Sequence, residues 1–197
     1  MMKKVLSSAI LLACVTASAG ENYFSNEWDA KGLIAIEGSG GSMSLVNQDT
    51  TGITVDDSTG AGSVALKLGG ESRYYRLFVE GRYYMLDASG YESSKATSLG
   101  LQVDYLIRAG EHFNIFMGLN GGGIFSNFQK QGTPSVQYTN KDAYIGAQAG
   151  VNIDIIDNLG IELGVRTKHA FTDNNVTAIT NAYEGYVAIV FKFTGEY

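Results

Sequence analysis

From about residue 32 onward, the chain repeats one pattern: short segments in which apolar and other residues alternate, separated by polar breaks. Strict alternation has a period of two, which places alternate side chains on the two faces of a sheet. The segment 75–83 is the clearest, since Leu77 and Val79 share one face and Arg76 and Glu80 share the other. The pattern predicts eight strands, over 32–45, 62–70, 75–83, 99–107, 113–120, 143–154, 161–166 and 183–193.

The breaks between these segments alternate in length. Four are long, over 46–61, 86–95, 127–140 and 172–181, and three are short, over 70–73, 108–111 and 156–158. Outer-membrane barrels have an even number of strands, with short periplasmic turns and longer outer loops. The order therefore predicts an all-β fold, an eight-stranded antiparallel up-and-down transmembrane barrel with four longer external loops.

The apolar face of the segments has aromatic residues at its ends. Tyr75 and Tyr83 bracket Leu77 and Val79, and they lie roughly 26 Å apart along a strand at ~3.3 Å per residue. When the strand is tilted by about 40° from the membrane normal, this distance corresponds to roughly 20 Å along the normal, close to the ~25 Å apolar band of a membrane barrel. Two aromatic girdles facing lipid are therefore predicted, made of Tyr75, Tyr83, Tyr105, Phe113, Phe125, Phe171, Tyr183, Phe191 and Phe193.

The opposite face carries charges of both signs. A soluble barrel with an apolar pocket would not hold so many, because an unpaired charge in a narrow lumen is costly. We therefore expect an ion-pair network in the lumen, formed by Glu37, Lys67, Arg76, Glu80, Arg82, Asp104, Asp154, Glu162, Arg166, Lys168, Glu184 and Lys192. An eight-stranded interior is only just wide enough for side chains, so the network should plug the barrel. The alternative is a narrow, porin-like channel for small ions or solutes.

The N-terminus has the features of a secretory signal peptide over residues 1–19. Lys3 and Lys4 precede a short apolar run, and a small-residue site predicts cleavage between Ala19 and Gly20. The run is too short to cross a bilayer as a helix. A competing interpretation, left open, is lipidation at Cys14, which follows a lipobox-like sequence. With cleavage after Ala19, we expect residues 20–31 to form a periplasmic N-terminal segment and 32–197 the barrel domain.

Composition supports an all-β protein and excludes several functions. The chain has 25 glycines, 12 tyrosines, 9 phenylalanines and one proline, Pro134, which falls in a predicted loop. The net charge is −6 and no basic run follows Lys4, which argues against nucleic-acid binding. With two histidines, and with the single cysteine inside the signal, we expect no metal site and no cofactor.

The chain resembles the OmpA/OmpX-type family of small outer-membrane barrels, including opacity-protein-like members. The resemblance rests on the strand count, the alternation of loop lengths and the ending Gly-Tyr-Val-Ala-Ile-Val-Phe-Lys-Phe-Thr-Gly-Glu-Tyr. It implies a multi-pass protein of the bacterial outer membrane, in contact with its lipids and lipopolysaccharide. It also implies a C-terminal strand, ending in Phe193 or Tyr197, that the assembly machinery recognises. We expect a monomer without an attached peptidoglycan-binding domain.

Little in the sequence points to catalysis. Near the seventh segment the chain resembles outer-membrane lipid A deacylases, whose histidine precedes a nucleophilic serine by two residues; here His169 precedes Phe171, so the nucleophile is missing. Asp49, Asp56 and Asp57 form a solvated acidic stretch, and Asn175 lies in a glycosylation-like sequence. We therefore expect a non-enzymatic envelope protein whose loops contact a partner or an external ligand. A lipid A-modifying enzyme is the distant alternative.

Overall fold

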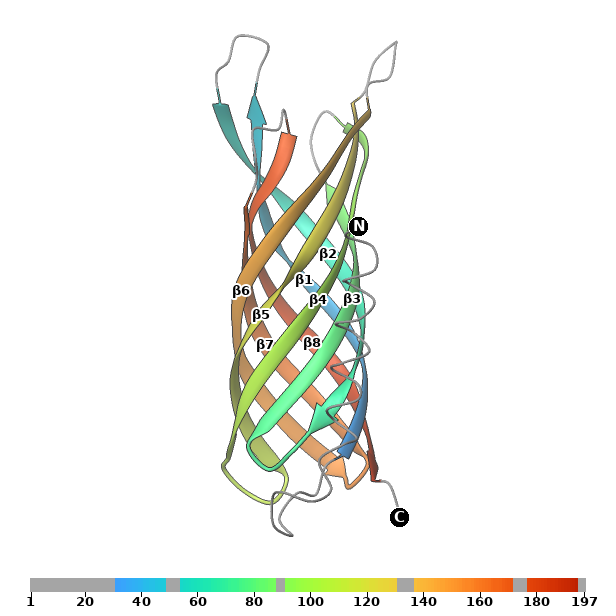
Figure 1. Cartoon of the computed structure of the whole chain (residues 1–197), viewed down its shortest axis with the longest axis vertical. Helices are drawn as coiled ribbons and strands as arrows, with labels where there is room; N and C mark the ends of the chain where they lie inside the picture. Colours follow the sequence, from blue (N-terminus) through green and yellow to red (C-terminus); the bar gives the residue numbers. More distant parts are fainter. Residues whose placement is uncertain (1–30, 49–53, 88–90, 131–136, 172–176, 195–197) are drawn as a thin grey trace, which may run out of the picture.

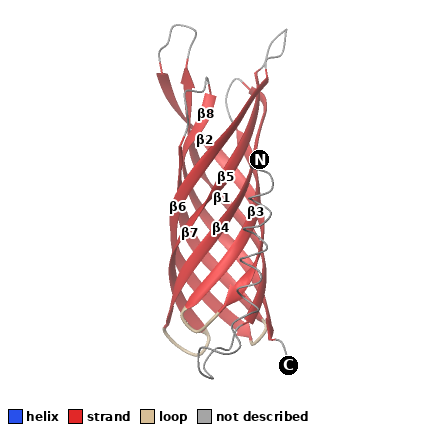
Figure 2. Cartoon of the chain, in the orientation of Figure 1, coloured by secondary structure: helices blue, strands red, loops and turns tan. Residues whose placement is uncertain are grey.

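The chain forms a closed barrel in which each of eight antiparallel strands pairs with its neighbours and β1 pairs with β8 (Figure 1). The computed structural model describes residues 31–48, 54–87, 91–130, 137–171 and 177–194. Figure 2 shows that strands make up nearly all of this part. The strands are β1 (Lys31–Gln48), β2 (Thr54–Glu71), β3 (Tyr75–Asp87), β4 (Tyr91–Arg108), β5 (Phe113–Lys130), β6 (Gln137–Ile156), β7 (Leu159–Phe171) and β8 (Thr177–Thr194).

The predicted eight-stranded antiparallel barrel is confirmed, and its strands are tilted. A row of paired residues that starts at Ile34 runs once around the barrel and returns to β1 at Ser44. This stagger is the shear that a closed barrel with tilted strands requires. Within the described residues, no helix is long and apolar enough to cross a membrane.

The predicted long connections were wrong in extent. β1 and β2 remain paired as far as Gln48 and Thr54, so most of the predicted loop 46–61 is strand. The same holds for 86–95, 127–140 and 172–181, where the strands leave only 88–90, 131–136 and 172–176 between them. These segments lack apolar alternation, because a strand that extends beyond the apolar band of the membrane needs no apolar face. Backbone hydrogen bonds alone continue the strand pairing there.

The short connections lie where they were predicted, at the end of the barrel that contains the start of β1. They are Ser72–Tyr74, Ala109–His112 and Asp157–Asn158. Ser72 N donates to Tyr75 O over 2.8 Å, and Ala109 N donates to Phe113 O over 3.0 Å. Following the outer-membrane pattern, we refer to this end as periplasmic and to the other as outer.

Several sequence predictions fall outside the described residues. They are the signal peptide with Cys14, Ala19 and Gly20, the segment 20–30, Asp49, Pro134, Asn175 and Tyr197.

The polarity of the barrel is inverted relative to a soluble protein. Leu66, Leu101 and Val165 face outward with 52%, 48% and 64% of their surface exposed, whereas Lys67 and Arg76 are each 1% exposed. Exposed aliphatic residues extend around all eight strands. Such an exterior is compatible only with a bilayer, and a closed barrel satisfies every backbone hydrogen bond there. The barrel therefore spans a membrane.

The predicted girdle aromatics all lie on the exterior. Tyr75, Tyr105, Phe113, Phe191 and Phe193 are exposed near the periplasmic end, and Tyr83, Phe125, Phe171 and Tyr183 are exposed toward the outer end. Tyr75 and Tyr105 face each other across β3 and β4, with ring centroids 5.4 Å apart. Their placement fits the two interfaces of a bilayer.

Candidate functional site

The lumen is where the charges of the described chain gather. Eleven of the predicted residues are buried inside the barrel, and the twelfth, Asp154, is half-buried. The structure adds Glu71, which sequence reasoning missed although it faces the same side of β2 as Lys67. Its parity along the strand was the available signal.

Glu37 on β1 is the centre of this network. Its carboxylate pairs with Lys67 on β2, Arg82 on β3 and Arg166 on β7. Arg166 donates to both carboxylate oxygens, over 2.9 and 3.1 Å. Such a bidentate pair is stronger and more directional than a single contact. One carboxylate thus joins three cations from three strands.

Glu80 on β3 forms a second hub nearer the outer end. It accepts hydrogen bonds from Arg82 over 3.0 and 2.9 Å and from Lys168 over 3.2 Å, and it lies 3.5 Å from Arg166. Lys168 also donates to the hydroxyl of Tyr84 over 2.9 Å. Two facing strands, β3 and β7, are therefore joined directly across the lumen.

The network continues toward the periplasmic end. Arg76 pairs with Asp104 at 2.8 Å and with Glu162 at 2.7 Å. Lys192 pairs with Asp154 at 2.9 Å and with Glu71 at 3.3 Å. Amide side chains fill the positions between them, as where Gln148 donates to Asp104 over 2.6 Å. Charged and amide groups thus occupy the lumen from Lys192 up to Lys168.

Aromatic rings pack between the ion pairs. The Arg166 guanidinium lies 4.5 Å from the centroid of Tyr186, and Arg76 lies 4.8 Å from that of Phe116. Cations over ring faces are attracted by the ring quadrupole, which partly compensates for their lost hydration. These rings fill volume that the charged side chains leave empty.

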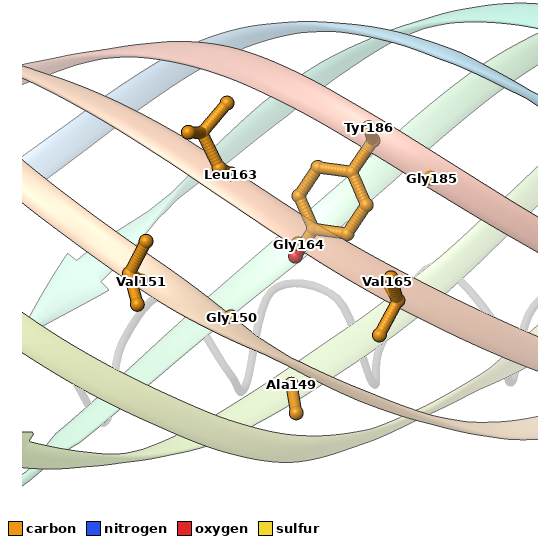
Figure 3. A pocket seen from close by; sticks show the side chains of 8 residues that line it. All are labelled: Ala149, Gly150, Val151, Leu163, Gly164, Val165, Gly185 and Tyr186. Carbon is orange, nitrogen blue, oxygen red and sulfur yellow. The ribbon is translucent and has the colours of Figure 1, made fainter.

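Glycines in the wall make room for these rings. Figure 3 shows the Tyr186 ring lying across Gly164, with Leu163 and Val165 on either side. A Cβ at Gly164 would lie 2.6 Å from the Tyr186 ring, and one at Gly150 would lie 2.6 Å from Phe116. The absence of a side chain at these positions therefore has a packing reason.

Replacing Gly164 by Ala should lower the free energy of unfolding by about 1–3 kcal/mol, because the ring has to move within a filled lumen. The matched control is Gly185→Ala on the next strand, where a Cβ would meet nothing within 4 Å. Urea unfolding of both variants in phospholipid vesicles, followed by gel mobility, measures the difference. Equal stability of the two variants would contradict this packing argument.

An apolar cluster, which sequence reasoning did not predict, lies in the outer part of the lumen beside buried polar side chains such as Asp142 and Ser126. The buried side chains of this outer cluster come from seven of the eight strands: Met43, Leu45, Tyr84, Ala96, Ile124, Phe128, Tyr144, Ala170, Ile179 and Ala182. A bulge between β1 and β8 contributes to it, because the register shifts between Ser44 and Leu45 and Leu45 then pairs with Ile179. Continued alternation from Tyr183 would have placed Ile179 outside; the shift turns it inward.

No group of three or more histidine, cysteine, aspartate or glutamate side chains in the described part of the chain could hold a metal ion. His169 lies on the exterior, where its Nδ1 is 2.9 Å from Asn181 Oδ1 and its ring contacts Phe171 edge-on at 5.3 Å.

The comparisons with known proteins agree on the architecture. No protein-family model matches the chain, and no curated protein matches it either. Among solved structures it is similar to Neisserial surface protein A, with 14% identity and a TM-score of 0.61 over 84% of this chain and 99% of that one. The fold is that of the OmpA/OmpX-type outer-membrane barrels.

Two further solved structures are similar at lower scores. Outer membrane protein H of Pseudomonas aeruginosa has 15% identity and a TM-score of 0.49, covering 83% of this chain and 99% of its own. The N-terminal barrel domain of OprF from the same species has 13% identity and a TM-score of 0.47, again over 83% and 99%. Together with the apolar exterior, the OmpA/OmpX-type fold identifies a multi-pass protein of the bacterial outer membrane.

Proposed function

We propose that this protein is a structural, non-enzymatic component of the outer membrane whose lumen is plugged and whose outer strands hold loops for contact with molecules outside the cell. The observation that carries the first part is the filled lumen. Glu80 on β3 meets Lys168 on β7, on the opposite wall, and Glu37 on β1 reaches past β8 to Arg166 on β7.

The outer cluster adds a second barrier in series with the ion pairs. An ion passing through would have to leave water, separate paired charges and then cross an apolar layer that contains Phe128 and Ile179. Each step is costly in a medium of low dielectric constant. This favours the plug over the alternative, a narrow channel for small ions or solutes.

The conductance of the refolded protein in a planar bilayer tests this proposal. We expect no steady openings from barrels whose folded state is confirmed by their heat-dependent gel mobility. The positive control combines Glu80→Ser and Arg82→Ser with Phe128→Ala and Ile179→Ala. It removes a neutral pair and opens the apolar cluster in series with it, so it should conduct and show that the assay detects an open lumen. Stable openings from the unaltered protein would replace the plug by the channel.

The exterior and the C-terminal strand support the remaining parts of the proposal. The girdle aromatics would anchor the barrel in the lipids at both interfaces. β8, which ends with the exposed Phe191 and Phe193 and closes the barrel against β1, would be the strand that the assembly machinery recognises. Exposed aliphatic residues surround the barrel as lipid contacts, and we expect a monomer.

The proposed outer contacts rest on the uneven upper rim. β3 ends at Asp87 and β7 at Phe171, whereas β1–β2 and β4–β5–β6 continue beyond them (Figure 1). Strands paired beyond the apolar band give the outer loops a rigid base, and such scaffolds commonly carry binding residues.

Shortening the β5–β6 hairpin tests this contact role. Replacing residues 127–139 by Asn-Gly would join the cross-strand partners Ser126 and Asn140 by a two-residue turn. Cells displaying this variant should lose adherence to matrix- and glycan-coated surfaces while the barrel keeps its heat-dependent mobility. Unchanged adherence would remove this hairpin from the proposal.

A further inference from the structure

Two lysines stand on the exterior of the barrel just above the outer aromatics. Lys95 on β4 and Lys141 on β6 are both exposed, and they flank β5. Across β4, β5 and β6, one row of paired residues is Lys95, Asn127 and Thr139. The neighbouring row on the periplasmic side is Thr97, Phe125 and Lys141. Two strand spacings across β5 and an offset of two residues along the strands place the two Cα atoms about 12 Å apart.

The tilt of the strands brings both lysines to one height. The row of paired residues that contains Lys95 reaches β6 at Thr139, and this row rises toward the outer end of the barrel from β4 to β6. Lys141 lies on β6 two residues nearer the periplasmic end than Thr139. That offset compensates for the rise at the tilt of about 40° that an eight-stranded barrel has. Both side chains thus reach the same layer of the membrane, directly above the exposed ring of Phe125.

The surface between the lysines is open. A shallow hollow of about 450 Å³ is lined by Lys95, Thr97, Phe125, Asn127 and Thr139, among others. The ring of Phe125 lies toward Gly123, since a Cβ at Gly123 would be 3.7 Å from its edge. The ring is thereby turned toward the membrane centre and leaves the space above it free for a polar group.

The charges of this patch have no ion-pair partner among the side chains that the structure describes. No ion pair joins Lys95 or Lys141 to a carboxylate within the described ranges, in contrast to the six paired cations of the lumen. Asp87, an exposed carboxylate near the outer end of β3, lies on the far side of Lys95 from Lys141. Lys95 lines a hollow above an apolar ring, and Lys141 is the cross-strand partner of the residue that carries this ring, Phe125. Two cations so placed complement an anionic group whose attached chains lie in the bilayer.

We propose that Lys95, Lys141 and the hollow between them bind a phosphate of the glycolipid that forms the outer leaflet, with its acyl chains packed along the face of β5 below Phe125. The amide of Asn127 and the hydroxyls of Thr97 and Thr139 supply neutral hydrogen bonds around the same hollow. The site requires the outer-membrane location, and it is independent of whether the lumen conducts.

Binding of lipid A to the folded full-length barrel in neutral glycoside micelles tests the site, with native mass spectrometry as the measure of occupancy. Lys95→Gln and Lys141→Gln should each weaken binding about fivefold and the double variant about 25-fold, given what one surface lysine contributes near anionic lipid. The control is Lys31→Gln, at the periplasmic end of β1, which should bind as the unaltered protein does.

The chemistry of the probe separates the sources of the anion. Dephosphorylated lipid A should bind to the unaltered protein as weakly as intact lipid A binds to the double variant. Inorganic phosphate at a concentration equal to that of lipid A should not displace it. Undiminished binding by the double variant, or equal binding of dephosphorylated lipid A, would overturn the site. Displacement by inorganic phosphate would overturn the assignment to a lipid.

Discussion

Replacing Glu37 by Gln is expected to lower the free energy of unfolding by about 3–5 kcal/mol, the largest effect of any single substitution considered for this protein. Gln keeps the size of the side chain and removes its charge. Lys67, Arg82 and Arg166 would then face one another around a neutral group while they remain 1–3% exposed. Glu80 and Glu162 would remain near these three cations but neutralise them only in part. The excess positive charge can neither hydrate nor separate in a closed barrel.

Urea titration of the barrel in phosphatidylcholine vesicles measures this loss. The matched control is Glu111→Gln, an exposed carboxylate in the turn between β4 and β5, which should change stability by less than about 0.5 kcal/mol. The double variant Glu37→Gln/Lys67→Met should be more stable than the sum of its single effects predicts, because it restores the charge balance. Additive effects would show that the hub is not a coupled network.

Replacing Leu101 by Arg is expected to cost about 2–4 kcal/mol, because the side chain faces hydrocarbon near the middle of the membrane. Leu101 is 48% exposed on β4 and lies between the exposed Tyr105, four residues away on the periplasmic side, and Lys95, six residues away on the outer side. The depth control is Thr97→Arg on the same strand and face, close to the outer interface, where about 0–1 kcal/mol is expected.

The same vesicle titration compares these two variants. A larger cost at Leu101 than at Thr97 follows only if this face of β4 lies in the bilayer with its outer end at the interface. Equal costs would contradict the assignment of the exterior to lipid, whatever the lumen does.

Much of the barrel was predictable because its local pattern and its global fold agree. Along β3, Leu77 and Val79 are more exposed than Arg76 and Glu80, which are buried, as the alternation in the sequence predicts. A period of two admits only two faces. The charges of both signs on one face predicted an interior in which Glu37 and Arg82 meet, but the pairing itself depends on which strands face each other across the lumen. No pattern within a strand carries that information.

The outer end of the barrel shows where the local pattern stops being informative. Segments such as 54–61 and 137–142 are polar on both faces, so periodicity did not distinguish strand from loop, and only pairing with β1 and β5 shows that they are strands. The bulge opposite Ser44 likewise reverses the face of Ile179, which alternation along β8 alone assigns to the outside.

The sequence by itself determined the number of strands, their inner and outer faces, the inverted polarity and hence the membrane, because all of these follow from side-chain period and charge along one strand. The tertiary structure alone decided that three cations share Glu37, that Gly164 lies under Tyr186, and that Lys95 and Lys141 lie on either side of β5. These contacts join residues that are far apart in the chain, and their distances are set by the closure and shear of the barrel.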